Sequence, residues 1–127
     1  MTKDASEGSI KVYLCDDVAE LRALLRVVVE EDGMRVVGEA GDARTMLAEL
    51  AAADPDVVVL DLSLPGMDGL EAIPLVHEAV PDAHIVVFSG YGAEQMAAAA
   101  LEQKATRYVE KGSDLDGLCA AVREVAA

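Results

Sequence analysis

The sequence predicts an α/β domain in which five parallel strands form one sheet with helices on both faces. Short runs of β-forming residues alternate five times with longer segments whose apolar residues recur at helical spacing. The run VVVL at 57–60 contains no polar residue, which is typical of a central parallel strand that is covered on both faces. A chain of 127 residues has room for one such doubly wound domain and not for two.

The expected secondary structure begins with two strand–helix units. The segment IKVYLC at 10–15 is rich in β-forming residues and predicts the first strand. A helix is expected from residue 18 up to Gly33, and its apolar stripe consists of Val18, Leu21, Leu25 and Val28. The segment RVVGEA at 35–40 predicts the second strand. Asp42 is expected to cap a helix over 42–53, in which one side comprises Met46, Leu47 and Leu50.

Three further units follow the same pattern. The expected strands are 57–61, 84–89 and 107–111, and the expected helices are 70–80, 93–105 and 114–126. Pro74 falls within the first of these helices and is expected near its first turn or at a bend. The second helix is rich in alanine. The third has one apolar side formed by Leu115, Leu118, Cys119, Val122 and Val125.

Residues 1–9 are polar and predict a flexible N-terminal tail, so the domain is expected at 10–127. The tail lacks the apolar core of a signal peptide, and no apolar run approaches the ~18 residues of a membrane-spanning helix. Cys15 and Cys119 lie in apolar contexts, which predicts two small buried thiols and not a disulfide or a metal pair. These features predict a protein of the reducing cytoplasm.

The chain carries a strong excess of negative charge. It has 24 acidic and 10 basic side chains, which gives a formal net charge of −14. Such a charge repels the phosphate backbone of nucleic acids and anionic membrane surfaces, so we expect this segment to bind neither. Part of the acidity is available to bind a divalent cation.

Functional side chains stand where four of the predicted strands end: Asp16 and Asp17, Asp61, Ser89 with Gly90, and Lys111. In a doubly wound sheet, ligands bind along the edge where the carboxyl ends of the strands meet. Asp61 is the most informative of these residues, because it follows an apolar strand where an unpaired charge is costly. By itself Asp61 could equally cap a turn. The presence of Asp16, Asp17 and Lys111 at other predicted strand ends favours a functional site over a turn cap.

The chemistry of this cluster predicts a divalent metal and a phosphoryl group. Three converging carboxylates cannot all stay ionised without a cation, and oxygen ligands favour Mg²⁺ or Mn²⁺. The metal and Lys111 would offset the charge on phosphoryl oxygens, and Ser89 could donate a hydrogen bond to one of them. Gly90 leaves room for the group to arrive. Asp61 is therefore the expected nucleophile.

Four segments carry a family resemblance: CDD at 15–17, LDLSLPGMDGLEAI at 60–73, VVFSG at 86–90 and YVEKG at 108–112. Over residues 10–126 the chain resembles the receiver domains of two-component response regulators. The resemblance implies a flavodoxin-like fold of five strands in the order 2-1-3-4-5. It also implies a signalling domain that catalyses only its own phosphotransfer and dephosphorylation.

The resemblance implies a role for each acidic residue. Asp61 would accept a phosphoryl group from a histidine kinase or a phosphotransfer protein, with Mg²⁺ as cofactor. Asp16 and Asp17 would hold the ion, with Asp17 as the more direct ligand, and Asp61 and the backbone carbonyl of Ser63 would complete the protein's share of the ligands. An output domain or protein downstream is the implied second partner.

The resemblance also implies a switch and shows two departures from the family. Ser89 and Tyr108 match the switch residues, and Lys111 matches the lysine that pairs with the phosphoryl group. Gly112 stands where the family usually has a proline after a cis bond, so we expect a trans bond and a different loop. Lys104 stands where the family favours a glycine, which removes an inexpensive helix stop. Both departures lie near the usual output face.

Two other functions are open to the sequence. One is a pseudo-receiver, an interaction module in which Asp61 is never phosphorylated. The other is a Mg²⁺-dependent aspartyl phosphatase, although such enzymes resemble Asp-x-Asp at the nucleophile and this chain has Ser63 at the third position. For the signalling function, Val18, Ala19 and Arg22 are the expected kinase-docking residues, because they would lie beside the pocket on the first helix.

Overall fold

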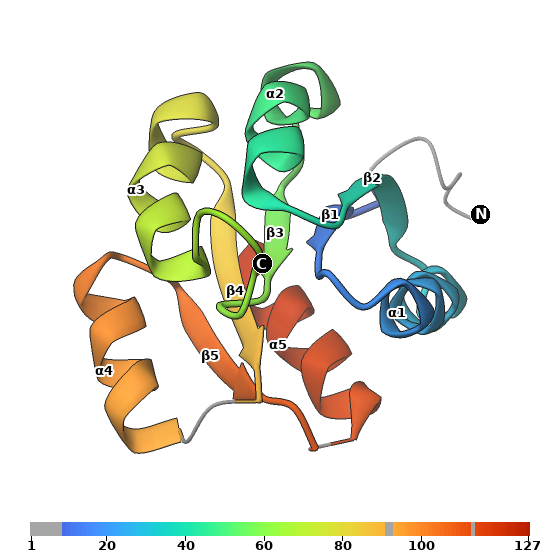
Figure 1. Ribbon diagram of the computed structural model, residues 1–127. Coiled ribbons are helices and arrows are strands. Elements are labelled where there is room, and N and C mark those ends of the chain that lie inside the picture. Colours follow the sequence, from blue (N-terminus) through green and yellow to red (C-terminus); the bar gives the residue numbers. More distant parts are fainter. Residues whose placement is uncertain (1–8, 91–92, 113) are drawn as a thin grey trace.

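The structure is a computed structural model that describes residues 9–90, 93–112 and 114–127. Five parallel strands form one sheet in the order β2-β1-β3-β4-β5, as predicted (Figure 1). The strands are β1 (Lys11–Cys15), β2 (Arg35–Ala40), β3 (Val57–Leu60), β4 (His84–Ser89) and β5 (Arg107–Glu110). The helices are α1 (Ala19–Glu31), α2 (Ala43–Ala53), α3 (Gly69–Ala79), α4 (Ala93–Glu102) and α5 (Leu115–Ala126). The predicted flexible tail lies outside the described residues except for Ser9.

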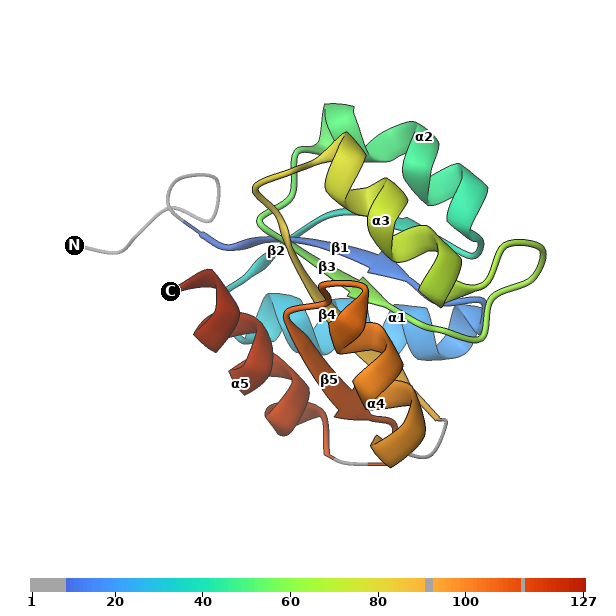
Figure 2. The same cartoon turned by 90° about the vertical axis from the view of Figure 1, so that its left-hand side faces the viewer.

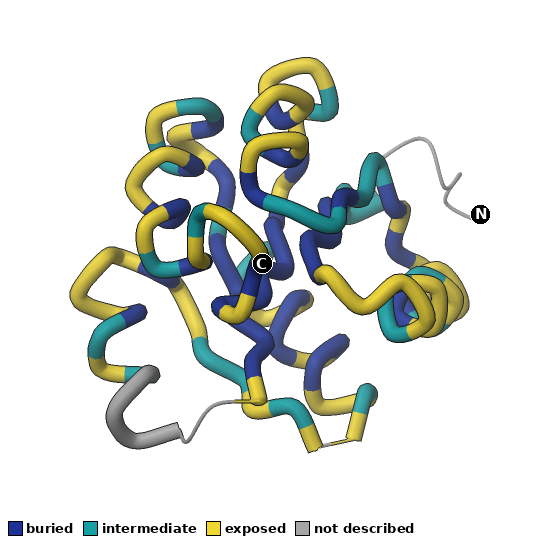
Figure 3. Tube along the Cα trace, in the orientation of Figure 1, coloured by how far each residue is buried: buried dark blue, intermediate teal, exposed yellow. Residues whose placement is uncertain are grey.

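Helices cover both faces of the sheet, as the two views in Figures 1 and 2 show. On one face, side chains of α1 and α5 pack on the sheet, including Leu25, Val29 and Leu118. On the other face, Met46 of α2 and Ile73 of α3 pack on the sheet. Figure 3 shows the buried residues concentrated in the central strands and on the inward sides of the helices. This arrangement leaves the two ends of the sheet for loops, and the site forms at the carboxyl end.

The central strand is buried along its whole length. All four residues of β3 are at most 2% exposed, with Val57 and Val59 facing α1 and α5 and with Val58 and Leu60 facing the other layer. Burying an aliphatic side chain of this size contributes about 1.5–3 kcal/mol. The strand ends one residue earlier than predicted, so Asp61 belongs to the loop that leaves the sheet.

Three helices begin at an aspartate cap. The Asp42 carboxylate accepts a hydrogen bond of 2.8 Å from the backbone N–H of Thr45, which confirms the predicted cap of α2. Asp68 and Asp114 cap α3 and α5 in the same way. Helix α3 starts one residue earlier than predicted, so Pro74 is its sixth residue and lies just beyond the first turn.

Helix α4 ends three residues before the predicted end at 105, because Lys104 adopts a left-handed conformation with φ of 73°. The N–H of Lys104 donates to the carbonyl of Leu101, and the N–H of Ala105 donates to the carbonyl of Ala100. These two bonds form a Schellman motif, the usual helix stop in which glycine occupies the left-handed position. The stop is therefore present without the glycine that makes it inexpensive.

We expect Lys104→Gly to raise the free energy of unfolding by about 1 kcal/mol, because glycine adopts positive φ without a steric penalty. Chemical denaturation of the purified domain measures the change. Lys104→Ala is the matched control, since alanine has the same difficulty at positive φ and is expected to leave stability nearly unchanged. Equal stability of the glycine and alanine variants would show that φ at residue 104 is not the cause.

Gly112 follows Lys111 through a trans peptide bond, as predicted, and has φ of +103°. Proline cannot adopt this φ, because its ring fixes φ near −65°. The backbone at Gly112 therefore adopts a conformation that the family's usual proline would not allow.

Candidate functional site

The sheet order brings the predicted acidic residues and the lysine together at its carboxyl edge. Strands β1 and β3 are hydrogen-bonded neighbours, and the N–H of Asp61 donates to the carbonyl of Cys15 immediately before Asp16. Strand β5 lies next to β4, and the N–H of Lys111 donates to the carbonyl of Ser89 at 2.7 Å. Backbone pairing therefore continues one residue past the strands and sets where each functional side chain starts.

Lys111 joins the two buried carboxylates. Its Nζ lies 2.8 Å from Asp16 Oδ2 and 3.1 Å from Asp61 Oδ2. Asp16 and Asp61 are each only 2% exposed, and they belong to the few buried charged or polar residues in the described chain. Buried carboxylates without a partner cation would be strongly destabilising, so Lys111 is the internal counter-ion of the site.

The three carboxylates offer a set of oxygen ligands that suits a hard divalent cation. Asp16, Asp17 and Asp61 each offer an oxygen, and these three oxygens lie within 4.8 Å of one another. Asp16 Oδ2 is buried and, apart from its ion pair with Lys111, accepts no hydrogen bond of good geometry. A buried oxygen with no partner other than the Lys111 ammonium, beside two further carboxylates, fits Mg²⁺ or Mn²⁺, which prefer oxygen ligands.

The other oxygens of the buried pair are held by loop backbone. Asp61 Oδ1 accepts a hydrogen bond of 3.0 Å from the N–H of Ser63, and Asp16 Oδ1 accepts one of 2.9 Å from the N–H of Val18. Each carboxylate thus has one oxygen fixed by its own loop and one turned toward Lys111. This division orients both side chains before any ligand arrives.

Burial and charge shift the acid–base properties of the site. Burial raises the pKa of Asp61 above its usual value, and hydrogen bonds from Ser63 and Lys111 offset only part of this effect. For Lys111, burial alone would lower the pKa, but the bonds to Asp16 and Asp61 outweigh it and raise the pKa. Lys111 therefore stays protonated, and the site lacks enough positive charge for its carboxylates.

A pocket of about 350 Å³ opens above this cluster. Its lining residues are Asp17, Val18, Asp61, Ser63, Gly90 and Lys111. Among the described residues, a side-chain carbon placed on Gly90 would meet no atom within 4 Å, so none of them fills the pocket on that side. Such a volume admits a small charged group together with water.

The two predicted switch residues contact each other. Ser89 is the fully buried last residue of β4, and Tyr108 on β5 is half-buried. Burial raises the pKa of the Tyr108 hydroxyl, and a hydrogen bond with the Ser89 hydroxyl opposes this shift. The tyrosine is thereby coupled to the strand end nearest the pocket.

The sequence did not reveal the role of Gly69, the first residue of α3. A side-chain carbon placed there would lie 2.5 Å from the Cα of Leu62 and would also collide with the carbonyl oxygen of Asp61. The N–H of Gly69 donates to the Leu62 carbonyl at 2.9 Å. Only glycine lets the helix start pack this closely on the backbone of Asp61. A glycine directly after a capping aspartate was the available signal.

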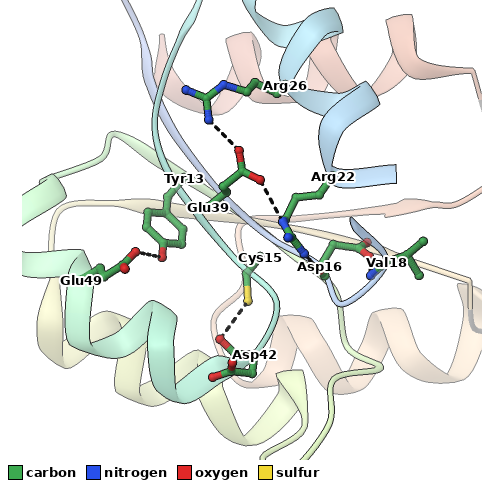
Figure 4. Close-up of polar contacts among 9 residues, drawn as sticks. All are labelled: Tyr13, Cys15, Asp16, Val18, Arg22, Arg26, Glu39, Asp42 and Glu49. Carbon is green, nitrogen blue, oxygen red and sulfur yellow. Dashed lines mark hydrogen bonds and ion pairs between the residues drawn. The ribbon is translucent and has the colours of Figure 1, made fainter. Parts of the chain in front are cut away.

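Arg22 has a different position from the one expected. Val18 and Ala19 are exposed beside the pocket, as docking residues would be. The Arg22 guanidinium instead turns inward to the Asp16 carbonyl and to Glu39 (Figure 4). A docking role for Val18 and Ala19 stays a prediction.

Comparison with known families decides the identity. The family model described as the response regulator receiver domain matches residues 12–123. The chain is a response regulator receiver domain. The sheet order and the converging strand ends described above are those expected from the sequence for such a domain.

Relatives of this receiver domain include chemotaxis proteins and larger regulators. The chemotaxis protein CheY of Thermotoga maritima is 31% identical over 101 residues, covering 80% of this chain and 84% of that protein. A protein-glutamate methylesterase/protein-glutamine glutaminase of Hahella chejuensis is 42% identical over 80 residues, covering 63% of this chain. This chain matches only 23% of the length of that methylesterase.

The receiver domain also resembles solved structures. A LuxR-family two-component response regulator from an Aurantimonas species superposes with a TM-score of 0.88 at 32% identity, covering 94% of this chain and 86% of the other. A CheY-like receiver domain from Methanospirillum hungatei has a TM-score of 0.85 at 21% identity, which shows the same fold. In the described part of the receiver domain, no helix has both the length and the apolar character needed to cross a membrane.

Proposed function

We propose that this receiver domain accepts a phosphoryl group on Asp61 from a histidine kinase or a phosphotransfer protein and so switches a partner-binding face. The observation that carries the proposal is the buried Asp61 carboxylate, which lines the open pocket with Lys111 Nζ 3.1 Å from its Oδ2. A nucleophile, a fixed cation and a binding space therefore meet at one point.

The transfer is a displacement at phosphorus. An oxygen of the ionised Asp61 carboxylate forms a bond to phosphorus, and the bond from phosphorus to the donor atom breaks. That atom is the imidazole nitrogen of a phosphohistidine or the acyl oxygen of acetyl phosphate, and it keeps the electron pair. The Lys111 ammonium, already held between Asp16 and Asp61, offsets negative charge on the phosphoryl oxygens.

The residues that would hold Mg²⁺ or Mn²⁺ are Asp16, Asp17, Asp61 and the backbone carbonyl of Ser63. The first three have carboxylate oxygens within 4.8 Å of one another, and Ser63 lines the same pocket. When bound, the ion supplies further positive charge for the phosphoryl oxygens. The bound ion would also offset the negative charge that Asp16 and Asp17 place near the nucleophile.

Ser89 and Tyr108 would report the modification to the surface. The hydrogen bond between their hydroxyls joins the end of β4 to the side chain on β5. A phosphoryl group that takes the Ser89 hydroxyl as a donor changes this contact and alters the preference of the α4–β5–α5 face for its partner. A nearly complete shift between two states requires about 5.5 kcal/mol of differential interaction.

The first test is phosphorylation in the presence and absence of metal. With Mg²⁺ and acetyl phosphate, intact-protein mass spectrometry is expected to show one phosphoryl group per chain. Chelation of the metal is expected to slow incorporation by roughly a hundredfold, because three carboxylates would then repel the phosphodonor. Beryllofluoride with Mg²⁺ should likewise give a one-to-one complex.

The same experiment separates the two alternatives. A pseudo-receiver forms no adduct with any of these reagents. An aspartyl phosphatase turns over added phosphate esters many times, which requires a proton-transfer group. Ser63 occupies the place where such enzymes carry a second aspartate, so we expect one modification per chain and no rapid turnover of added phosphate esters.

A further inference from the structure

The backbone of the β1–α1 loop, which carries Asp16 and Asp17, is fastened by a side chain from α1. Arg22 Nη1 donates a hydrogen bond of 2.6 Å to the carbonyl oxygen of Asp16 (Figure 4). That carbonyl belongs to the peptide group linking Asp16 to Asp17. The N–H of Asp16 donates to the carbonyl of Ala40 at 3.1 Å, so both sides of Asp16 are tied to neighbouring elements.

The Arg22 guanidinium is itself held in place. Its Nε donates to Glu39 Oε1 at 2.9 Å, and Arg26 donates to Glu39 Oε2 at 2.6 Å (Figure 4). Burial alone would raise the pKa of Glu39, but the bonds from Arg26 and Arg22 outweigh it and lower the pKa. A side-chain carbon on Gly41 would lie 3.3 Å from Arg22 Nη1, so the glycine gives the guanidinium its space.

Asp17 depends on this fastening more than the other two acids do. Asp16 and Asp61 have hydrogen bonds to their side chains, from Val18 and Ser63 respectively. The Asp17 carboxylate is exposed and, among the described residues, is held by no donor of its own. Its place beside the other two carboxylates is therefore set by the backbone that precedes it.

We propose that Arg22 is a positioning residue for the cation site: by fixing the peptide group between Asp16 and Asp17, it sets the affinity for a divalent metal. The inference rests on the proposed function, because it concerns the same site. It assigns Arg22 to the site's support and not to partner docking. Residues that orient metal ligands from outside the ligand set commonly change metal affinity by tenfold or more.

The sign of the effect distinguishes positioning from simple electrostatics. Removing a positive charge near a cation site strengthens cation binding through Coulomb's law. Loss of a positioning contact weakens it. Arg22→Met keeps much of the aliphatic stem and removes the charge, so the two explanations predict opposite changes in the dissociation constant for Mn²⁺.

The experiment is calorimetric titration of the purified receiver domain with Mn²⁺ at fixed ionic strength. We expect Arg22→Met to weaken Mn²⁺ binding about tenfold. Arg26→Met is the matched control, because Arg26 lies one turn further along α1 and binds the same Glu39 but does not contact Asp16. Arg26→Met is expected to keep the dissociation constant for Mn²⁺ within about twofold of the wild-type value. It should lower the denaturation midpoint about as much as Arg22→Met does.

A second variant changes no charge. Gly41→Ala presses on the Arg22 guanidinium and is expected to weaken Mn²⁺ binding a few-fold, so it decides the question should Arg22→Met not fold. Unchanged or tighter Mn²⁺ binding by folded Arg22→Met, or by Gly41→Ala in its place, would overturn the inference alone. A wild-type domain that binds no Mn²⁺ would overturn the proposed function and the inference with it.

Discussion

Asp61→Asn is expected to reduce phosphoryl incorporation from acetyl phosphate and Mg²⁺ by roughly a thousandfold or more, the scale on which removal of a nucleophile usually acts. An amide oxygen is a much weaker nucleophile than a carboxylate, and the neutral side chain also contributes less to metal binding. The shape of the side chain is retained, so the pocket keeps its form. Mass spectrometry of the intact chain measures the modified fraction over time.

The matched control is Asp82→Asn, which removes one exposed carboxylate just before β4, at the end of the sheet opposite the pocket. Its phosphorylation rate should equal that of the wild type. Phosphorylation of the Asp61→Asn variant at the wild-type rate would mean that another residue is the acceptor, and peptide mapping would identify it.

Stability measurements show whether the Asp61→Asn variant is folded. Burial raises the folded-state pKa of Asp61 above its unfolded value, so this group favours folding fully below pH ~4 and loses that contribution as pH rises through the folded pKa. In the presence of a chelator at pH 7, the asparagine variant should therefore unfold at a higher denaturant concentration than the wild type. The difference should shrink toward pH 4, where Asp61 is protonated.

Gly69→Ala is expected to lower the free energy of unfolding by about 3 kcal/mol, at the upper end of the usual cost of overpacking. The added carbon would lie 2.5 Å from the Cα of Leu62 and would collide with the Asp61 carbonyl. Both obstacles are backbone, which cannot rotate away as a side-chain tip can. Either α3 loses its first turn or the loop carrying Asp61 moves.

The displaced loop should also impair function. A shift of about 1 Å in a reacting group can cost roughly a hundredfold in rate. We expect Gly69→Ala to be phosphorylated more slowly than the wild type under conditions where it is fully folded. Denaturant titration gives the stability, and the acetyl phosphate assay gives the rate.

Gly117→Ala is the matched control for the stability loss. Gly117 is the third residue of α5, and among the described residues an added carbon there would meet only Asp114 Oδ1, at an ordinary 3.6 Å. Replacing an exposed helical glycine with alanine usually adds about 0.5–1 kcal/mol. The two substitutions should thus have opposite signs, and a Gly69→Ala variant as stable as Gly117→Ala would contradict the close packing at Asp61.

The sequence was sufficient to predict the sheet and the convergence of the acidic residues and the lysine at its carboxyl edge. Alternation of strand and helix periods predicts a parallel sheet, and the strand order follows from the family resemblance. The meeting of Asp16, Asp61 and Lys111 was predictable because each stands at the end of a predicted strand, and parallel strands bring their carboxyl ends to one edge. Asp17 comes with Asp16 for the same reason.

Only the tertiary structure revealed the contacts that support those residues. Arg22 looks like a surface residue of an amphipathic helix, and its role depends on a carbonyl in another loop and on Glu39 in another strand. The role of Gly69 is set by the close approach of two backbone segments, which leaves no periodic pattern in the sequence.

The physical reason lies in the range of the interactions. The apolar residues that become buried recur along the chain with the period of a helix or a strand, so the pattern can be recognised from the sequence alone. A hydrogen bond between a side chain and a carbonyl distant in sequence forms only when separate elements are placed to within a few tenths of an ångström. The sequence therefore determined which groups meet at the end of the sheet, and the packed structure decided how firmly each of them is held.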